Sequence, residues 1–177
     1  MFSPCSQPIE MNFSGFFFHT AVIGTMAVIQ SVFLANGIVG GVTPDFALLV
    51  LTFSANQQGS LKGQTAGFVT GFVQDVLSIT PLGFHAFSRT VIGYLFGAFK
   101  GKIFIDPLLI PILLAIVATV IKAVLGFGLL AIFSPGQADV VFSVKLAIEL
   151  GLNSVAAPFL YGFFRMIKFV KYSRKEQ

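Results

Sequence analysis

Six ionisable side chains interrupt segments of this chain that are otherwise apolar. They are three acids and three bases: Asp45, Asp75, Arg89, Lys122, Lys145 and Glu149. A charge in apolar surroundings is stabilised only by a partner or by a wet cavity, so such residues mark structural or functional sites. Because acids and bases are equal in number, we expect them to pair with one another.

The spacing of these residues suggests two pairs. Asp75 and Arg89 flank the turn "TPLG" at 80–83, and Lys145 and Glu149 lie one helical turn apart. The other two members could join either pair. The cluster is then either a purely structural network or the wall of a polar cavity that binds a ligand or a partner. Four further polar residues would extend it: Gln74, His85, Asn153 and Ser154.

Glycines recur at every fourth position in two neighbouring segments. The first, within "GQTAGFVTGFVQD", holds Gly63, Gly67 and Gly71, and the second, "GYLFGAFKG", holds Gly93, Gly97 and Gly101. Residues four apart share one face of a helix, and small residues let helix backbones approach closely in lipid. We expect the two segments to pack on each other as a hairpin; the alternative is a contact with another protein.

Motifs of soluble enzymes are missing from the sequence. It contains no HExxH, no GxSxG and no phosphate-binding loop, and one cysteine with two distant histidines does not make a metal site. No nucleophile accompanies the acids at a useful spacing. We therefore predict a protein that is not an enzyme and that has no metal and no cofactor.

The composition is that of an integral membrane protein. Of 177 residues, 55% are hydrophobic and 10% are charged, whereas soluble domains have about 25% charged residues. The apolar runs are continuous, which favours helices over the alternating pattern of a membrane barrel. We predict an all-α, polytopic protein with about six transmembrane helices, near 16–35, 42–56, 62–79, 82–99, 107–132 and 140–165.

Basic residues indicate the orientation of these spans, because cytoplasmic loops retain positive charge. Lys62 lies between the second and third spans, Lys100 and Lys102 lie between the fourth and fifth, and five more basic residues occur in 165–177. The other three loops contain no lysine or arginine. We therefore expect one transmembrane domain over 1–177, with both termini cytoplasmic and a short basic tail at 166–177.

The net charge of +4 belongs mainly to this tail, beside the last span. A juxtamembrane basic cluster predicts contact with anionic lipid and no nucleic-acid partner. Turn residues fit the expected boundaries. "TPD" at 43–45 and "DP" at 106–107 resemble a helix N-cap followed by proline at the first helical position.

The segment from about 40 to 105 carries a family pattern. It opens with "PD" at 44–45 and continues with "GxxxGFxxGxxxD" at 63–75, "PLGFHAF" at 81–87 and "VIGYLFG" at 91–97. This pattern resembles the bacterial rod shape-determining protein MreD. The resemblance covers about 60 residues, and the remaining spans agree with it in number and hydrophobicity.

The resemblance implies a non-enzymatic scaffold subunit of the inner membrane that supports cell shape and lateral peptidoglycan synthesis. Its implied partners are MreC and, through it, the penicillin-binding transpeptidase, RodA and MreB. It also implies a fold similar to the substrate-binding subunits of energy-coupling-factor vitamin transporters. The alternative function is therefore a substrate-capture subunit, which would dock its transport partner through small residues of the first span: Ala21, Gly24 and Ala27.

Overall fold

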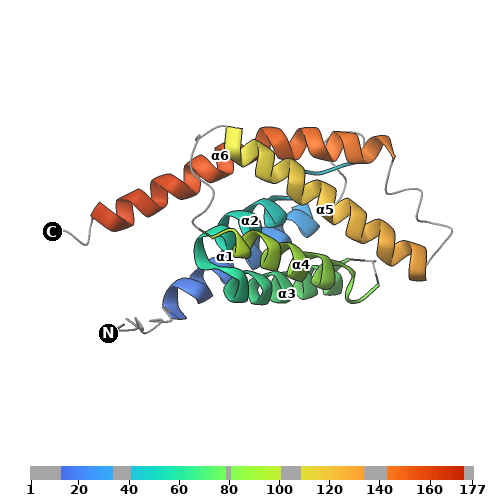
Figure 1. The fold of residues 1–177 in the computed structure, drawn as a ribbon, viewed down its shortest axis with the longest axis horizontal. Helices are drawn as coiled ribbons and strands as arrows, with labels where there is room; N and C mark the ends of the chain where they lie inside the picture. Colours follow the sequence, from blue (N-terminus) through green and yellow to red (C-terminus); the bar gives the residue numbers. More distant parts are fainter. Residues whose placement is uncertain (1–12, 34–40, 79–80, 101–108, 134–142, 174–177) are drawn as a thin grey trace, which may run out of the picture.

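The computed structural model describes residues 13–33, 41–78, 81–100, 109–133 and 143–173, and these form an all-helical bundle (Figure 1). The predicted fold class is confirmed in this respect. Six helices follow one another along the chain: α1 (Phe13–Phe33), α2 (Phe46–Gln58), α3 (Ser60–Leu77), α4 (Phe84–Ala98), α5 (Leu109–Phe133) and α6 (Val144–Ser173).

Two of these helices are long and apolar enough to cross a membrane. They are α5 and the part of α6 from Val144 to Phe164. α2 has 13 residues, which span only about 20 Å at the helical rise, less than the ~30 Å of a bilayer core. Six crossings therefore stay a prediction.

Two predicted boundaries shift in the structure. α2 begins at Phe46 with Asp45 as its N-cap, so the expected cap at Thr43 with Pro44 inside the helix was wrong. α6 continues to Ser173, and part of the predicted tail is therefore helical. Figure 1 shows α6 changing direction between its orange and red halves. Pro158 lies near the middle of α6 in the sequence. Proline removes a backbone hydrogen bond and commonly kinks a helix.

α2 is the central helix of the bundle, because it contacts each of the other five. Its first turns are almost completely buried, with Ala47, Leu48, Leu49 and Leu51 at 0% exposure. A helix that is apolar on all sides can be buried completely by other helices. α2 therefore does not have to span the lipid layer by itself, and a short segment is sufficient. Only Gly59, at a φ of 98°, separates α2 from α3, and this left-handed conformation favours glycine.

α3 and α4 form a tight antiparallel hairpin through their glycines. A methyl group on Gly71 would lie 2.6 Å from the Cα of Ala86, and one on Gly97 would lie 2.5 Å from the Cα of Ser60. Gly63 and Gly93 face each other in the same way, each against the other's backbone. At these positions the facing backbones leave room for the hydrogen of glycine but not for a side chain. The sixth glycine of the two ladders, Gly101, lies outside the described residues.

We expect Gly67→Ala to destabilise the hairpin. The new methyl group would lie 2.7 Å from the carbonyl carbon of Arg89, so the two backbones must separate. Overpacking of this kind costs about 1–3 kcal/mol. The measurement is the free energy of unfolding of the purified protein, titrated with dodecyl sulfate in mixed micelles.

The matched control is Gly128→Ala on α5, where an added methyl group meets no atom within 4 Å. This variant should unfold at the parent's denaturant concentration or slightly above it, because alanine favours helix. Equal stability of the two variants would show that the α3–α4 contact is not as close as described.

Candidate functional site

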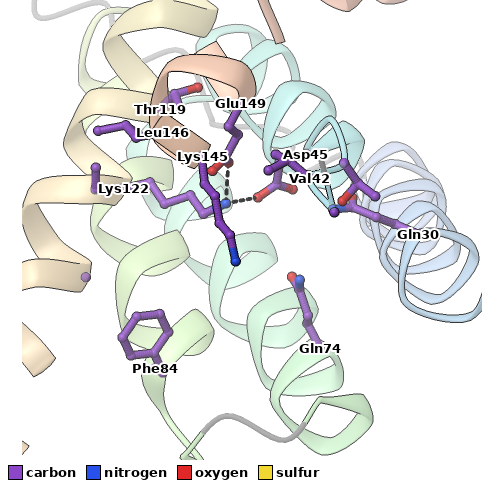
Figure 2. Close-up of a pocket in the computed structure, with 14 residues that line it drawn as sticks. Gln30, Val42, Asp45, Gln74, Phe84, Thr119, Lys122, Lys145, Leu146 and Glu149 are labelled. Carbon is purple, nitrogen blue, oxygen red and sulfur yellow. Dashed lines mark hydrogen bonds and ion pairs between the residues drawn. The ribbon is translucent and has the colours of Figure 1, made fainter. Parts of the chain in front are cut away.

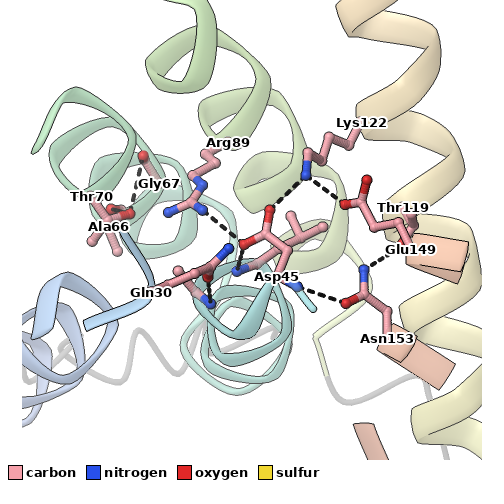
Figure 3. A network of polar contacts seen from close by, with 12 residues as sticks. Gln30, Asp45, Ala66, Gly67, Thr70, Arg89, Thr119, Lys122, Glu149 and Asn153 are labelled. Atoms are coloured by element: carbon pink, nitrogen blue, oxygen red, sulfur yellow. Dashed lines mark hydrogen bonds and ion pairs between the residues drawn. The ribbon is translucent and has the colours of Figure 1, made fainter. Parts of the chain in front are cut away.

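Asp45 is the centre of a buried charge network at one end of the bundle (Figure 3). Its Oδ1 accepts hydrogen bonds from the Leu48 backbone N–H at 3.0 Å and from Arg89 Nη2 at 2.9 Å. Its Oδ2 accepts one from Lys122 Nζ at 2.8 Å. One carboxylate thus caps α2 and binds α2 to both α4 and α5.

α6 joins the network through two side chains. Glu149 accepts a hydrogen bond from Lys122 Nζ at 2.6 Å. The Asn153 side-chain oxygen accepts from the Asp45 backbone N–H at 2.7 Å, while its Nδ2 donates to the Thr119 hydroxyl at 2.9 Å. Glu149 and Asn153 are four residues apart, so both project from one face of α6.

The network is neutral overall, with two carboxylates and two cations. Asp45 and Arg89 are 1% and 2% exposed, and the Lys122 and Glu149 side chains are 24% and 19% exposed. Removing a charge from water is unfavourable unless an opposite charge compensates it. Each of the four side chains therefore needs the others, and the network fixes the relative positions of four helices.

The structure overturns both ion pairs that the spacing suggested. Arg89 pairs with Asp45 instead of Asp75, and Glu149 pairs with Lys122 instead of Lys145. The suggested pairs joined residues that are close in sequence. The observed pairs join residues that the packing of α2, α4, α5 and α6 brings together.

Asp75 has a different role, at the N-terminus of α4. Its Oδ2 accepts from the backbone N–H groups of Gly83 at 2.9 Å and Ala86 at 3.0 Å, and its Oδ1 accepts from that of His85 at 2.9 Å. The first N–H groups of a helix have no partner within the helix, and its positive end attracts a carboxylate. Asp75 thus closes the α3–α4 hairpin at the end of the glycine ladder.

Of the other residues predicted to extend the cluster, one joins the network and two make local contacts. Asn153 belongs to the network, whereas the Ser154 hydroxyl donates to the Leu150 carbonyl within α6. The His85 ring packs edge-on against Phe84. Sequence reasoning missed Thr119, which lies three residues before Lys122 and hence on the same face of α5.

A second buried polar contact also escaped prediction. The hydroxyls of Thr52 and Tyr161 lie 2.8 Å apart and join α2 to α6 about two turns after the Asp45–Asn153 contact. One threonine and one tyrosine on helices that are far apart in the sequence give no spacing signal, so only the fold brings them together.

A cavity of about 390 Å³ lies beside the network (Figure 2). Its walls come from the end of α1, the segment 41–45 that leads into α2, the end of α3, the starts of α4 and α6, and the middle of α5. Lys145 and Gln74 line it together with Asp45, Lys122 and Glu149. In the part of the chain that the structure describes, no three His, Cys, Asp or Glu side chains form a group that could hold a metal ion.

A family comparison identifies the chain. The model of the rod shape-determining protein MreD matches residues 11–172, which is most of its length. This chain belongs to the MreD family. It is accordingly a membrane protein with a role in determining rod shape. No curated protein and no solved structure matches it.

We expect Asp45→Asn to be the most damaging single change in the network of this MreD family member. Asparagine still caps a helix, but Arg89 and Lys122 lose their shared negative charge. Leaving a buried charge uncompensated costs about 3–5 kcal/mol. Titration with dodecyl sulfate measures the loss.

Glu149→Gln is the matched control, since it also neutralises one carboxylate of the network. Lys122 keeps Asp45 as its partner in this variant, and the site is partly exposed. The expected loss is about 1–2 kcal/mol. A loss as large as that of Asp45→Asn would mean that Asp45 is not the centre of the network.

Replacements of Asp75 separate capping from ion pairing. Asp75→Ala removes the acceptor of three N–H groups, which should lower the free energy of unfolding by about 2–3 kcal/mol. Asp75→Asn keeps an oxygen acceptor and should lose about 1 kcal/mol. If both variants were equally unstable in the same titration, the negative charge and not the cap would be what α4 requires.

Proposed function

We propose that this chain is a non-enzymatic, multi-pass scaffold subunit of the bacterial inner membrane, which supports cell elongation by binding MreC. Through MreC it would act with the penicillin-binding transpeptidase, RodA and MreB in lateral peptidoglycan synthesis. The observation that carries the proposal is the match of the MreD family model over residues 11–172.

The charge network supports a scaffolding role over a catalytic one. Asp45, Arg89, Lys122 and Glu149 bind one another, and Asp75 binds the backbone of α4. A general acid or base must be free to exchange a proton with a substrate. Carboxylates held by two cations or by three N–H groups are suited to fixing helices in place.

The arrangement of the helices supports an even number of membrane crossings. α1 begins and α6 ends on the same side of the bundle, at the left in Figure 1. The junction of α2 with α3 and the end of α4 lie on this side as well. Lys62 follows that junction in the first turn of α3, and Lys100 Nζ donates a hydrogen bond to the Gln58 carbonyl. Positive charge marks the cytoplasmic face, so we assign both termini to the cytoplasm.

One observation weighs against a substrate-capture subunit. That function would present Ala21, Gly24 and Ala27 of α1 to a transport partner. Ala21 is exposed and Gly24 is half-buried, but Ala27 is fully buried in a core cluster with Ile23 and residues of α2 and α3. A buried side chain cannot contribute to a docking surface unless α1 moves away from the bundle.

The experiment is complementation in a rod-shaped bacterium that lacks its own MreD, combined with purification of the tagged chain in mild detergent. The parent chain should restore rods and copurify with MreC. Gly67→Leu should yield round cells and lose MreC, because the larger side chain separates α3 from α4. Gly128→Ala should behave as the parent. Immunoblots of the membrane fraction verify that all variants are present.

Two results would overturn the proposal. The first is a parent chain that is present in the membrane and keeps cells round without retaining MreC. The second is copurification of a vitamin with an energising transport partner, which would favour the substrate-capture function.

A further inference from the structure

The cavity beside the charge network contains a cation that the network does not neutralise. The four paired side chains of the network cancel, and Lys145 adds one positive charge at the cavity wall. Lys145 is exposed, and its ammonium group has no partner among the described residues. In Figure 2 this group points into the cavity, toward the space between Gln74 and Phe84. The cavity is therefore suited to a ligand with one negative charge.

Gln74 adds an unused hydrogen-bond acceptor to the same wall. Its side-chain oxygen is buried and has no hydrogen-bond partner in the described structure. A buried polar atom without a partner is unfavourable, so a ligand that donates a hydrogen bond there is stabilised. An alcohol hydroxyl meets this requirement, whereas a fully ionised phosphate or a trimethylammonium group has no hydrogen to donate.

An apolar groove of about 480 Å³ adjoins the polar cavity, between the start of α4 and the end of α5. Phe84 lines both spaces, and its ring lies against Gly126 of α5. The groove is otherwise formed largely by apolar side chains, including Leu82 and Phe133, which are 72% and 75% exposed. It therefore opens to the outside of the bundle.

We propose that these two spaces form one site for an anionic phospholipid with a hydroxylated headgroup. The phosphate binds Lys145, a headgroup hydroxyl donates to Gln74, and an acyl chain lies in the groove beside Phe84. Charge complementarity favours an anion, and the adjoining apolar groove favours a lipid over a free phosphate compound. The site is additional to the scaffold role and does not depend on it.

The test is native mass spectrometry of the full chain, released from micelles that contain equal amounts of phosphatidylglycerol, phosphatidic acid and phosphatidylcholine. In a mildly alkaline buffer, where the phosphate of phosphatidic acid is fully ionised, the parent should retain phosphatidylglycerol most, because only this lipid then combines one anionic charge with hydroxyl donors. Lys145→Gln should lower the preference for phosphatidylglycerol over phosphatidylcholine about fivefold, the effect of one cation near a membrane surface. Gln74→Leu should remove the preference for phosphatidylglycerol over phosphatidic acid.

Two matched controls separate the site from general lipid contact. Lys62→Gln removes a cation at the opposite end of the bundle and should leave the lipid preference unchanged. Leu130→Trp should fill the groove and reduce lipid retention, whereas Leu113→Trp fills a different apolar cavity, which lacks polar lining residues, and should not.

The proposal is overturned if Lys62→Gln lowers the preference as much as Lys145→Gln does. It is also overturned if an excess of glycerol phosphate displaces the lipid, since the site would then recognise a soluble ligand. Both results are independent of cell shape, so they leave the scaffold function intact.

Discussion

The structure depends on the placement of one carboxylate, that of Asp45, inside an apolar bundle. This residue is the N-cap of α2 and accepts a hydrogen bond from the Leu48 N–H in the first turn of that helix. It also forms ion pairs with Arg89 of α4 and Lys122 of α5. α6 is added by Glu149 and by Asn153, which binds the Asp45 backbone. In lipid no hydrophobic force distinguishes one helix contact from another, so such polar contacts specify which helices are neighbours.

The glycine ladder provides the second constraint, and the two are connected by α4. Close contact with α3 sets the position and rotation of α4. This orientation lets the Arg89 side chain reach from α4 to the Asp45 carboxylate. Asp75 then holds the beginning of α4 by its backbone N–H groups. The segment "GQTAGFVTGFVQD" is therefore one continuous contact surface, with glycine where backbones touch and an acid where the partner helix begins.

The sequence predicted those features that local chemistry determines. Continuous apolar runs gave the helices, and four-residue glycine spacing gave the two segments that pack as α3 and α4. Long-range pairing was not predictable in this way: Asp45 and Lys122 are 77 residues apart, and Asp45 and Arg89 are 44 apart. Several acids and bases in one bundle allow many combinations, and only the packing of helices selects among them. The burial of the short helix α2 among the other five helices was also not predicted, because hydropathy does not distinguish burial in protein from burial in lipid.

The most direct test of this account is a double-mutant cycle between Asp45 and Arg89, using Asp45→Asn and Arg89→Gln and the free energy of unfolding in mixed micelles. The account predicts a coupling energy of about 1.5–3 kcal/mol, as for other charged hydrogen-bonded pairs. Additive effects for this pair, together with coupling between Asp75 and Arg89, would contradict it.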